Sequence, residues 1–190
     1  TGVLSLIGNT PLIKIESLSK ETGCAIYGKA EFLNPGGSVK DRIALQIVEE
    51  ALADGRLAPG GLITEGTAGS TGVSLAMVAK AYGCKCFIAM PDDAAIEKAN
   101  ILTAMGAEVQ RVRPVSITHP DHQVNVARRR AEQEPGALFA DQFENPANLR
   151  AHLETGREIW EQTHGRVHGF VSGAGTGGTI AGVSHFLKSQ

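Results

Sequence analysis

The stretch NPGGSVKDR, residues 34–42, is the most informative part of this chain. A strand-like run over residues 25–33 leads into it, and apolar periodicity over residues 39–54 predicts a helix after it. The two glycines allow a ligand to approach the backbone closely, and Lys40 lies directly behind them at the expected helix start. A lysine in the first turn of a helix is usually a solvated surface residue. A lysine that loses water there instead stays nucleophilic, as Schiff-base chemistry requires, so Lys40 is a candidate catalytic residue.

A glycine-rich turn, EGTAGSTG at residues 65–72, follows a short strand expected at residues 62–64 and precedes a helix expected at residues 73–82. Glycines and small hydroxyl residues at a helix N-terminus can form an anion site from backbone N–H groups and the helix dipole. An ordinary helix cap made by Ser70 or Thr71 is the alternative. This turn alone leaves both interpretations open.

A second turn, SGAGTGGT at residues 172–179, lies between a strand expected at residues 168–172 and a helix expected at residues 180–187. Its four glycines leave the backbone free to surround a phosphate, and its two threonines add hydroxyl donors. The same residues fit the dinucleotide motif Gly-x-Gly-x-x-Gly, whose supporting acidic residue is expected about twenty positions further on. The threonines favour a phosphate monoester, because its dianion needs more donors than a pyrophosphate does.

Taken in order, these motifs resemble those of the cysteine synthase family, which are pyridoxal-phosphate enzymes of the tryptophan synthase β group (fold type II). The resemblance rests on NPGGSVKDR, on TAGSTG at residues 67–72, on QFENPAN at residues 142–148 and on GAGTGGT at residues 173–179. The opening IGNTPL, residues 7–12, also matches. The stretch around Lys40 is most similar to the cystathionine β-synthase branch, whereas TGREIW at residues 155–160 is more similar to O-acetylserine sulfhydrylase.

The resemblance implies a two-lobed α/β fold with parallel sheets flanked by helices. The alternation of strand and helix patterns along the chain favours the same architecture independently. A small, substrate-closing domain would span residues 35–136. The large domain would comprise residues 1–34 and residues 137–190, the second segment carrying the phosphate cup. Because family members are longer, we expect the C-terminal part of the large domain to lie outside this chain.

The resemblance also assigns a role to each motif residue. Lys40 matches the lysine that holds pyridoxal 5′-phosphate covalently. The cup for the cofactor phosphate would consist of Gly175, Thr176, Gly177, Gly178 and Thr179. The substrate would be bound by a loop and its partner across the cleft, namely Thr67, Gly69, Thr71 and Gln142.

The loop departs from the family pattern at two positions. The family usually reads Thr-Ser-Gly-Asn-Thr where this chain reads Thr-Ala-Gly-Ser-Thr at residues 67–71. The family asparagine is expected to bind the ring hydroxyl of the cofactor, and Ser70, which takes its place, is shorter by an amide. Ala68 lacks a hydroxyl that could help to bind substrate. Both departures bear on the choice of substrate and on the rate.

The expected function is cysteine synthase-like β-replacement, which converts O-acetylserine or a related O-activated serine and sulfide to cysteine. Lys40 would release the cofactor to the substrate and then remove the α-proton. Cystathionine β-synthase activity and serine/threonine dehydratase-type β-elimination are alternatives on the same scaffold. A catalytically weak binding or scaffold fragment is favoured by Ala68, Ser70 and the chain length. A nicotinamide dinucleotide-binding domain would leave the Lys40 motif unexplained.

Composition adds little to these expectations. The chain has 190 residues, a formal net charge of −2 and 20% charged residues, which favours neither a nucleic-acid nor a membrane partner. Its three cysteines form no disulfide framework, and Cys84 and Cys86 have no second ligand pair nearby for a metal. Without an apolar span or a visible signal peptide, we expect an intracellular protein of the cytoplasm or an organelle matrix. The expected partners are a small amino-acid substrate and a second copy of the chain.

Overall fold

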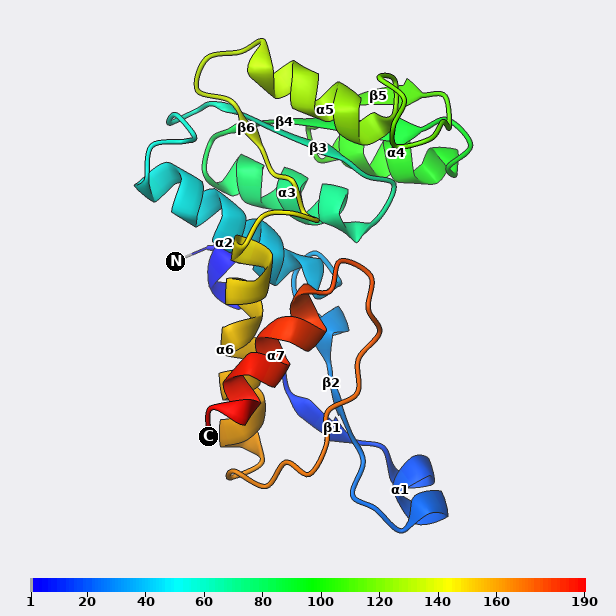
Figure 1. Ribbon diagram of the computed structural model, residues 1–190, viewed down its shortest axis with the longest axis vertical. Coiled ribbons are helices and arrows are strands. Elements are labelled where there is room, and N and C mark those ends of the chain that lie inside the picture. The colour runs from blue at the N-terminus through cyan, green and yellow to red at the C-terminus, as the bar shows by residue number, and fades with distance from the viewer. Residues whose placement is uncertain (1) are drawn as a thin grey trace.

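The computed structural model describes residues 2–190, which form two lobes joined at the helix α2 (Lys40–Ala53) (Figure 1). The upper lobe in Figure 1 contains a four-stranded sheet between helices, and the lower lobe contains two long helices beside a two-stranded sheet. The helix α2 packs on α3 of the upper lobe and on α6 of the lower lobe, so the residues at its start lie near both.

All four strands of the upper sheet run parallel, which confirms the α/β architecture expected from the sequence. Their order is β5-β4-β3-β6. The strands are β3 (Leu62–Gly66), β4 (Lys85–Pro91), β5 (Glu108–Val112) and β6 (Leu138–Phe139). The short β6 lies beyond residue 136, where the small domain was expected to end, and it pairs with β3 through Ile63 and Leu138. The upper sheet therefore includes residues 138–139, which were expected to belong to the large domain.

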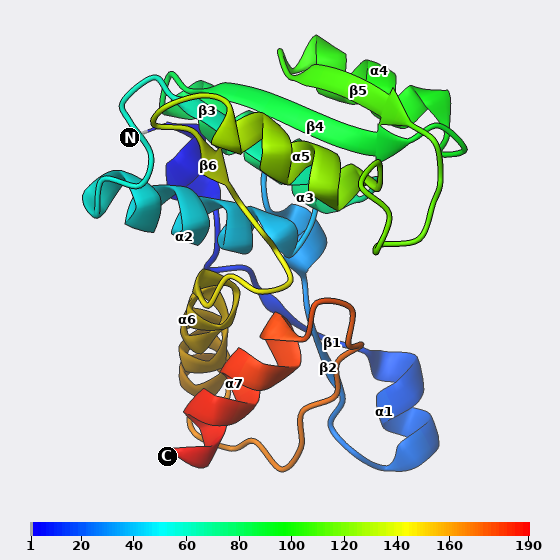
Figure 2. The ribbon, with the colours of Figure 1, turned by 45° about the horizontal axis from the view of Figure 1, so that its top comes forward.

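Helices cover both faces of this sheet, as Figure 2 shows in a second view. One face packs on α5 (Gln123–Glu132), and the other packs on α3 (Ser70–Ala81) and α4 (Ile96–Ala104). The central strands β3 and β4 are therefore buried on both faces, and their side chains alternate between them: Leu62 and Phe87 contact the α5 side, whereas Ile63 and Ile88 contact the α3 side.

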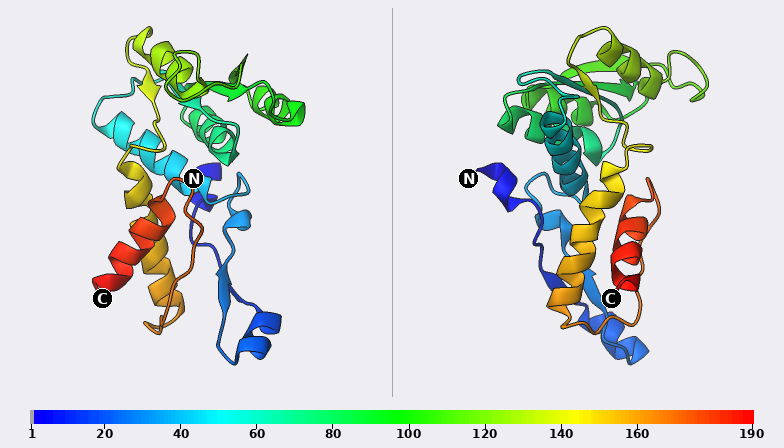
Figure 3. Two further views of the ribbon diagram at one scale, coloured as in Figure 1. Left: turned by 45° about the vertical axis from the view of Figure 1, so that its right-hand side comes forward. Right: turned by 60° about the vertical axis from the view of Figure 1, so that its left-hand side comes forward.

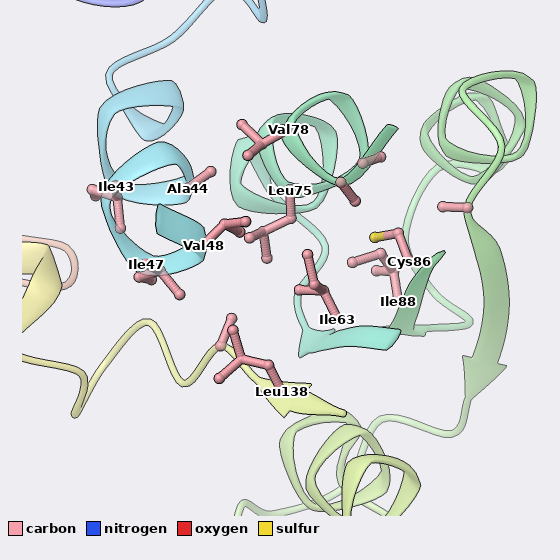
Figure 4. Packing of buried hydrophobic residues seen from close by; sticks show 14 of the residues in the cluster. Ile43, Ala44, Ile47, Val48, Ile63, Leu75, Val78, Cys86, Ile88 and Leu138 are labelled. Carbon is pink, nitrogen blue, oxygen red and sulfur yellow. The ribbon is translucent and has the colours of Figure 1, made fainter. Parts of the chain in front are cut away.

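The larger apolar core lies between α2, α3 and the sheet (Figure 4). Val48 of α2, Leu75 of α3 and Ile63 of β3 are fully buried and point toward one another. Each apolar side chain of this size contributes about 1.5–3 kcal/mol when it is buried. The start of α2 is therefore carried on a firmly packed helix.

The lower lobe is built around α6 (Ala147–Gln162) and α7 (Gly178–Lys188), which lie side by side in both views of Figure 3. Two glycines allow this close packing. A Cβ on Gly156 would overlap the side chain of Phe186, and a Cβ on Gly182 would overlap His152. The remaining elements of this lobe are β1 (Leu12–Lys14), α1 (Glu16–Thr22), β2 (Tyr27–Lys29) and η2 (Glu31–Leu33), with β1 and β2 antiparallel. The short helix η1 (Val3–Leu6) instead packs on α3 of the upper lobe.

The helices expected at residues 39–54, 73–82 and 180–187 are present as α2, α3 and α7, but two strand predictions were wrong in part or in whole. The run at residues 25–33 forms a strand only over Tyr27–Lys29 and then turns into the short helix η2. Residues 168–172 form no strand in the structure, and Val171 is 96% exposed. An apolar run becomes a strand only when a neighbouring strand takes its backbone hydrogen bonds, and residues 168–172 pair with no strand of the described chain. None of the helices formed by residues 2–190 is long and apolar enough to cross a membrane.

Candidate active site

Lys40 is the first residue of α2, and the Gly-Gly turn before it is held in place by a buried carboxylate. Asp41 accepts hydrogen bonds from the backbone N–H of Gly36 and from the hydroxyl of Ser74 on α3, each at 2.5 Å. A Cβ on Gly36 would overlap Asp41, and Gly37 has a φ of +80°. Both glycines are therefore required by the turn itself, and the turn fixes where Lys40 begins.

The amine of Lys40 points across the lobe junction toward α7. Its Nζ lies 3.5 Å from Oγ1 of Thr176, and the side chain is half-buried. Burial lowers the pKa of Lys40 from its usual value, because the charged ammonium loses water. These two residues are 136 positions apart in the sequence, so the fold brings the Lys40 motif and the second glycine-rich turn together.

The turn before α7 opens onto a cleft of about 1630 Å³ that Lys40 also lines. Four further candidate residues that line the cleft are Gly175, Thr176, Gly177 and Thr179. Gly177 is the N-cap of α7 with a φ of +82°, and no side chain caps the helix there. A Cβ at Gly175 or Gly177 would meet nothing within 4 Å, so this backbone is open to a ligand. The uncapped helix start offers free N–H donors to an anion.

The structure gives a packing reason for a glycine at position 178. A Cβ at this position would overlap the side-chain amide of Asn148 on α6. Asn148 donates from Nδ2 to Oγ1 of Thr176 and to the backbone oxygen of Gln142, each at 2.9 Å. One turn further along α6, Nε2 of His152 lies 3.2 Å from Oγ1 of Thr179. Glycine at position 178 therefore makes room for Asn148.

Asn148 and His152 were not recognised from the sequence as part of the site. Asn148 stood inside the quoted motif QFENPAN, but nothing local distinguished it from a helix-start residue. Both side chains are buried, and burial lowers the pKa of His152 to about 4, so the imidazole is neutral near pH 7. Their spacing of four residues on an otherwise amphipathic helix is the only sequence signal that could have identified them.

The expected substrate loop, residues 67–71, lies at the start of α3 and contacts Gln142 directly. The hydroxyl of Thr71 donates to Oε1 of Gln142 at 2.6 Å, and both side chains are buried. Oγ1 of Thr67 accepts from the N–H of Gly69 at 3.0 Å. The N-cap is Gly69 without a side-chain bond, so the alternative of a cap made by Ser70 or Thr71 is wrong. The start of α3 is left uncapped, like that of α7.

These loop residues and Gln142 do not line the cleft that Lys40 faces. A chain of hydrogen bonds connects the two groups instead, running from Thr71 through Gln142 and Asn148 to Thr176. The buried carboxyl of Glu65 supports this chain, since it accepts from the N–H of Gln142 at 3.1 Å. Burial raises the pKa of Glu65 to about 7.

The donors around Lys40 fit a phosphorylated ligand. They comprise two threonine hydroxyls, an uncapped helix N-terminus and an amine, arranged about an open glycine backbone. A partly desolvated amine beside an uncapped helix N-terminus is suited to a phosphorylated carbonyl compound that a lysine could bind. The chain belongs to the pyridoxal-phosphate dependent enzyme family, whose model matches residues 3–190.

Within this family the chain is similar to proteins named cysteine synthase. It is 54% identical over 200 residues to cysteine synthase 2 of Neurospora crassa, covering 100% of this chain and 44% of that protein. It is 45% identical over 190 residues to cystathionine beta-synthase of Apis mellifera, covering 98% of this chain and 38% of that protein. A crystal structure of cysteine synthase from Entamoeba histolytica matches with a TM-score of 0.90 and 37% identity, covering 99% of this chain and 56% of that one. The chain spans about half the length of the cysteine synthases it matches.

Proposed function

We propose that this chain carries the cofactor and substrate sites of a cysteine synthase-type enzyme, which joins sulfide to the β-carbon of O-acetylserine or a related O-activated serine. The observation that carries the proposal is the 3.5 Å approach of the Lys40 amine to Thr176 at the uncapped start of α7. That approach places a partly desolvated amine beside an anion cup. The similarity to proteins named cysteine synthase supports this choice within the family.

Pyridoxal phosphate, when bound, supplies an electron sink for the α-carbon of the substrate. The chain itself would hold the phosphate at Gly175, Gly177 and Gly178 and at the two threonines, Thr176 and Thr179. Lys40 would bind the cofactor covalently and, once displaced by the substrate, would take the α-proton on Nζ. The lowered pKa of Lys40 supports this second role, because a general base must be neutral to accept a proton.

The start of α3 would bind the substrate carboxylate. Gly69 leaves this helix uncapped, and Thr71 holds Gln142 against it. An uncapped helix N-terminus is suited to a carboxylate for the same reason that it is suited to a phosphate. We assign substrate binding to Thr67, Gly69, Thr71 and Gln142, and contact with the cofactor ring to Ser70.

Cystathionine β-synthase-type activity is the second candidate. Two observations favour it: the similarity to the Apis mellifera protein and the stretch NPGGSVKDR around Lys40. The two candidates differ in the leaving group of the first substrate and in the size of the thiol that attacks. The second candidate would use serine and an organic thiol, whereas the first would use O-acetylserine and sulfide.

The visible spectrum of the full chain, purified with pyridoxal phosphate, tests the proposal. We expect an absorption band from lysine-bound cofactor that shifts on addition of O-acetylserine and returns on addition of sulfide, with cysteine detected by mass spectrometry. A shift with serine and an organic thiol, but none with O-acetylserine, would favour the second candidate. A chain that binds no pyridoxal phosphate under any condition would contradict both.

Assembly and location belong to the same proposal. We propose a homodimer, supported by exposed large apolar side chains on the N-terminal segment, among them Leu6, Phe32 and Leu33. Analytical ultracentrifugation of the full chain tests this, and a monomer at all concentrations would contradict it.

We also propose that residues 35–136 form the domain that closes on the substrate. Limited proteolysis with and without O-acetylserine tests the closure. The proposed location of the protein is the cytoplasm or an organelle matrix.

A further inference from the structure

We infer that Asn148 and His152 are positioning residues that orient the hydroxyls of Thr176 and Thr179 as donors toward the cofactor phosphate. The two residues lie one turn apart on α6, and each contacts one threonine of the cup. The inference deepens the proposed function, because it rests on the phosphate binding at the start of α7. In this inference, α6 supplies the two side chains that orient the threonine hydroxyls.

Asn148 determines the direction in which the hydroxyl of Thr176 can donate a hydrogen bond. The backbone oxygen of Gln142 can only accept, so the group of Asn148 that faces it must be the amide NH₂. The second hydrogen of that NH₂ then points at Oγ1 of Thr176, 2.9 Å away. Thr176 therefore accepts from Asn148 and keeps its own hydrogen for an anion.

This orientation of Asn148 leaves one of its polar atoms unpaired. Oδ1 of Asn148 is buried without a hydrogen-bond partner among the described residues. An unpaired buried acceptor costs about 1–3 kcal/mol. Rotating the amide would relieve no strain, since Oδ1 would then face the oxygen of Gln142. The unpaired oxygen is thus the consequence of aiming the NH₂ group at Gln142 and Thr176 together.

His152 can orient Thr179 in the same way. Its Nδ1 lies 3.0 Å from Oγ1 of Thr155, and its Nε2 lies 3.2 Å from Oγ1 of Thr179. The imidazole is neutral, so one ring nitrogen donates and the other accepts. If Nε2 carries the hydrogen, Thr179 accepts and donates outward to the anion. The opposite tautomer would use the hydrogen of Thr179 on the ring and leave the anion one donor short.

Double-mutant cycles on cofactor affinity test the inference. The apo-protein of the full chain is titrated with pyridoxal phosphate for Asn148→Ala, Thr176→Val and the double variant, and likewise for His152→Phe and Thr179→Val. Each single substitution should weaken binding about tenfold, since it removes or misdirects one charge-assisted hydrogen bond. In each double variant, Asn148→Ala or His152→Phe should weaken binding by less than about twofold beyond the effect of the threonine substitution alone. His152→Gln, which keeps a donor near Nε2, should recover most of the affinity.

Matched controls separate orientation from folding. Asn125→Ala removes an amide that also donates two hydrogen bonds, but on α5, and His185→Phe changes an exposed histidine of α7. Both should leave cofactor affinity unchanged. Should Asn148→Ala fail to fold, Asn148→Ser keeps one donor and a smaller void, and the His152 cycle tests the same mechanism independently.

Nuclear magnetic resonance supplies a second measurement that a purely structural role would not change. With pyridoxal phosphate bound, the ¹⁵N shifts of His152 should report the neutral form with hydrogen on Nε2, and the ³¹P signal of the cofactor should move in the Asn148→Ala variant. Hydrogen on Nδ1, or additive losses in both cycles, would overturn the inference. If Thr176→Val and Thr179→Val leave affinity unchanged, the phosphate site of the proposed function is wrong instead.

Discussion

Lys40 stands out at the scale of single residues because its surroundings, and not its side chain, make it unusual. The Gly-Gly turn and Asp41 fix the first residue of α2, and burial beside Thr176 lowers the pKa of the amine. A solvated lysine at a helix start would have neither feature. Its position between the lobes distinguishes Lys40 from an exposed lysine such as Lys80 on α3.

Replacing Lys40 should abolish covalent attachment of the cofactor. We expect Lys40→Ala to yield no borohydride-reducible adduct, while the melting temperature stays close to that of the parent, because alanine is well tolerated at a helix start. Mass spectrometry of peptides after reduction with pyridoxal phosphate measures the adduct. Lys80→Ala is the control and should retain it. An adduct at a different lysine in Lys40→Ala would refute the assignment.

At the scale of elements, the two glycine-rich turns serve one purpose, which is to start a helix without a side-chain cap. Neither α3 nor α7 has a capping side chain, and the hydroxyls that could have capped them are directed elsewhere. Thr71 bonds Gln142, and Thr176 is held by Asn148. The free N–H groups of both helices therefore remain available to anionic groups of a ligand.

Ser70 tests how the start of α3 is adapted to its ligand. It is exposed at the first residue of the helix, so a longer side chain would fit there. We expect Ser70→Asn, alone or with Ala68→Ser, to raise the rate of β-replacement with O-acetylserine, because an amide would reach the cofactor ring without a bridging water. Steady-state kinetics measure the rate. An equal or lower rate in the double variant would mean that the loop serves a different substrate.

At the scale of the whole molecule, a buried ion cluster holds α2 to the lower lobe. Arg42, two residues after Lys40, forms a double hydrogen bond with Glu158 of α6, at 2.7 and 2.8 Å. Its remaining donors reach Glu31 at 2.8 and 2.9 Å, and Glu158 also accepts from Lys29. Although burial opposes ionisation, these partners lower the pKa of Glu158 to about 2. The cluster therefore secures the helix that carries Lys40.

Loss of this carboxylate should destabilise the protein in a pH-dependent way. The pKa of Glu158 falls from 4.5 to about 2 on folding, so its contribution is present above about pH 4.5 and is lost as the pH falls toward 2. At neutral pH we expect Glu158→Gln to lower the free energy of unfolding by about 3 kcal/mol. Below about pH 2 the variant and the parent should converge, because both then carry a neutral group.

Urea unfolding at a series of pH values measures this difference. The other paired carboxylate, Glu31, titrates in both proteins, so subtracting the two curves isolates Glu158. Glu154→Gln changes an exposed ion pair on the same helix and should alter the free energy by less than about 0.5 kcal/mol. A pH-independent difference between Glu158→Gln and the parent would show that shape, not charge, accounts for the loss.

Local pattern was enough to predict the parallel α/β class, the helices that follow the three motifs and the two glycine-rich turns. Helix periodicity and turn residues act over a few positions, and the helix expected at residues 39–54 is found at Lys40–Ala53. The motifs also predicted a shared site for Lys40 and the two threonines, Thr176 and Thr179. These features depend on neighbours in sequence, so they can be read along the chain.

Tertiary structure alone decided which distant groups meet. The run at residues 168–172 has a strand pattern but no strand beside it, and the lack of a side chain at Gly178 makes room for Asn148. Asn148, His152 and the Arg42–Glu158 pair act across 27 to 116 positions. No local preference encodes such pairings, because burial and hydrogen-bond satisfaction are properties of the packed chain and not of a short segment.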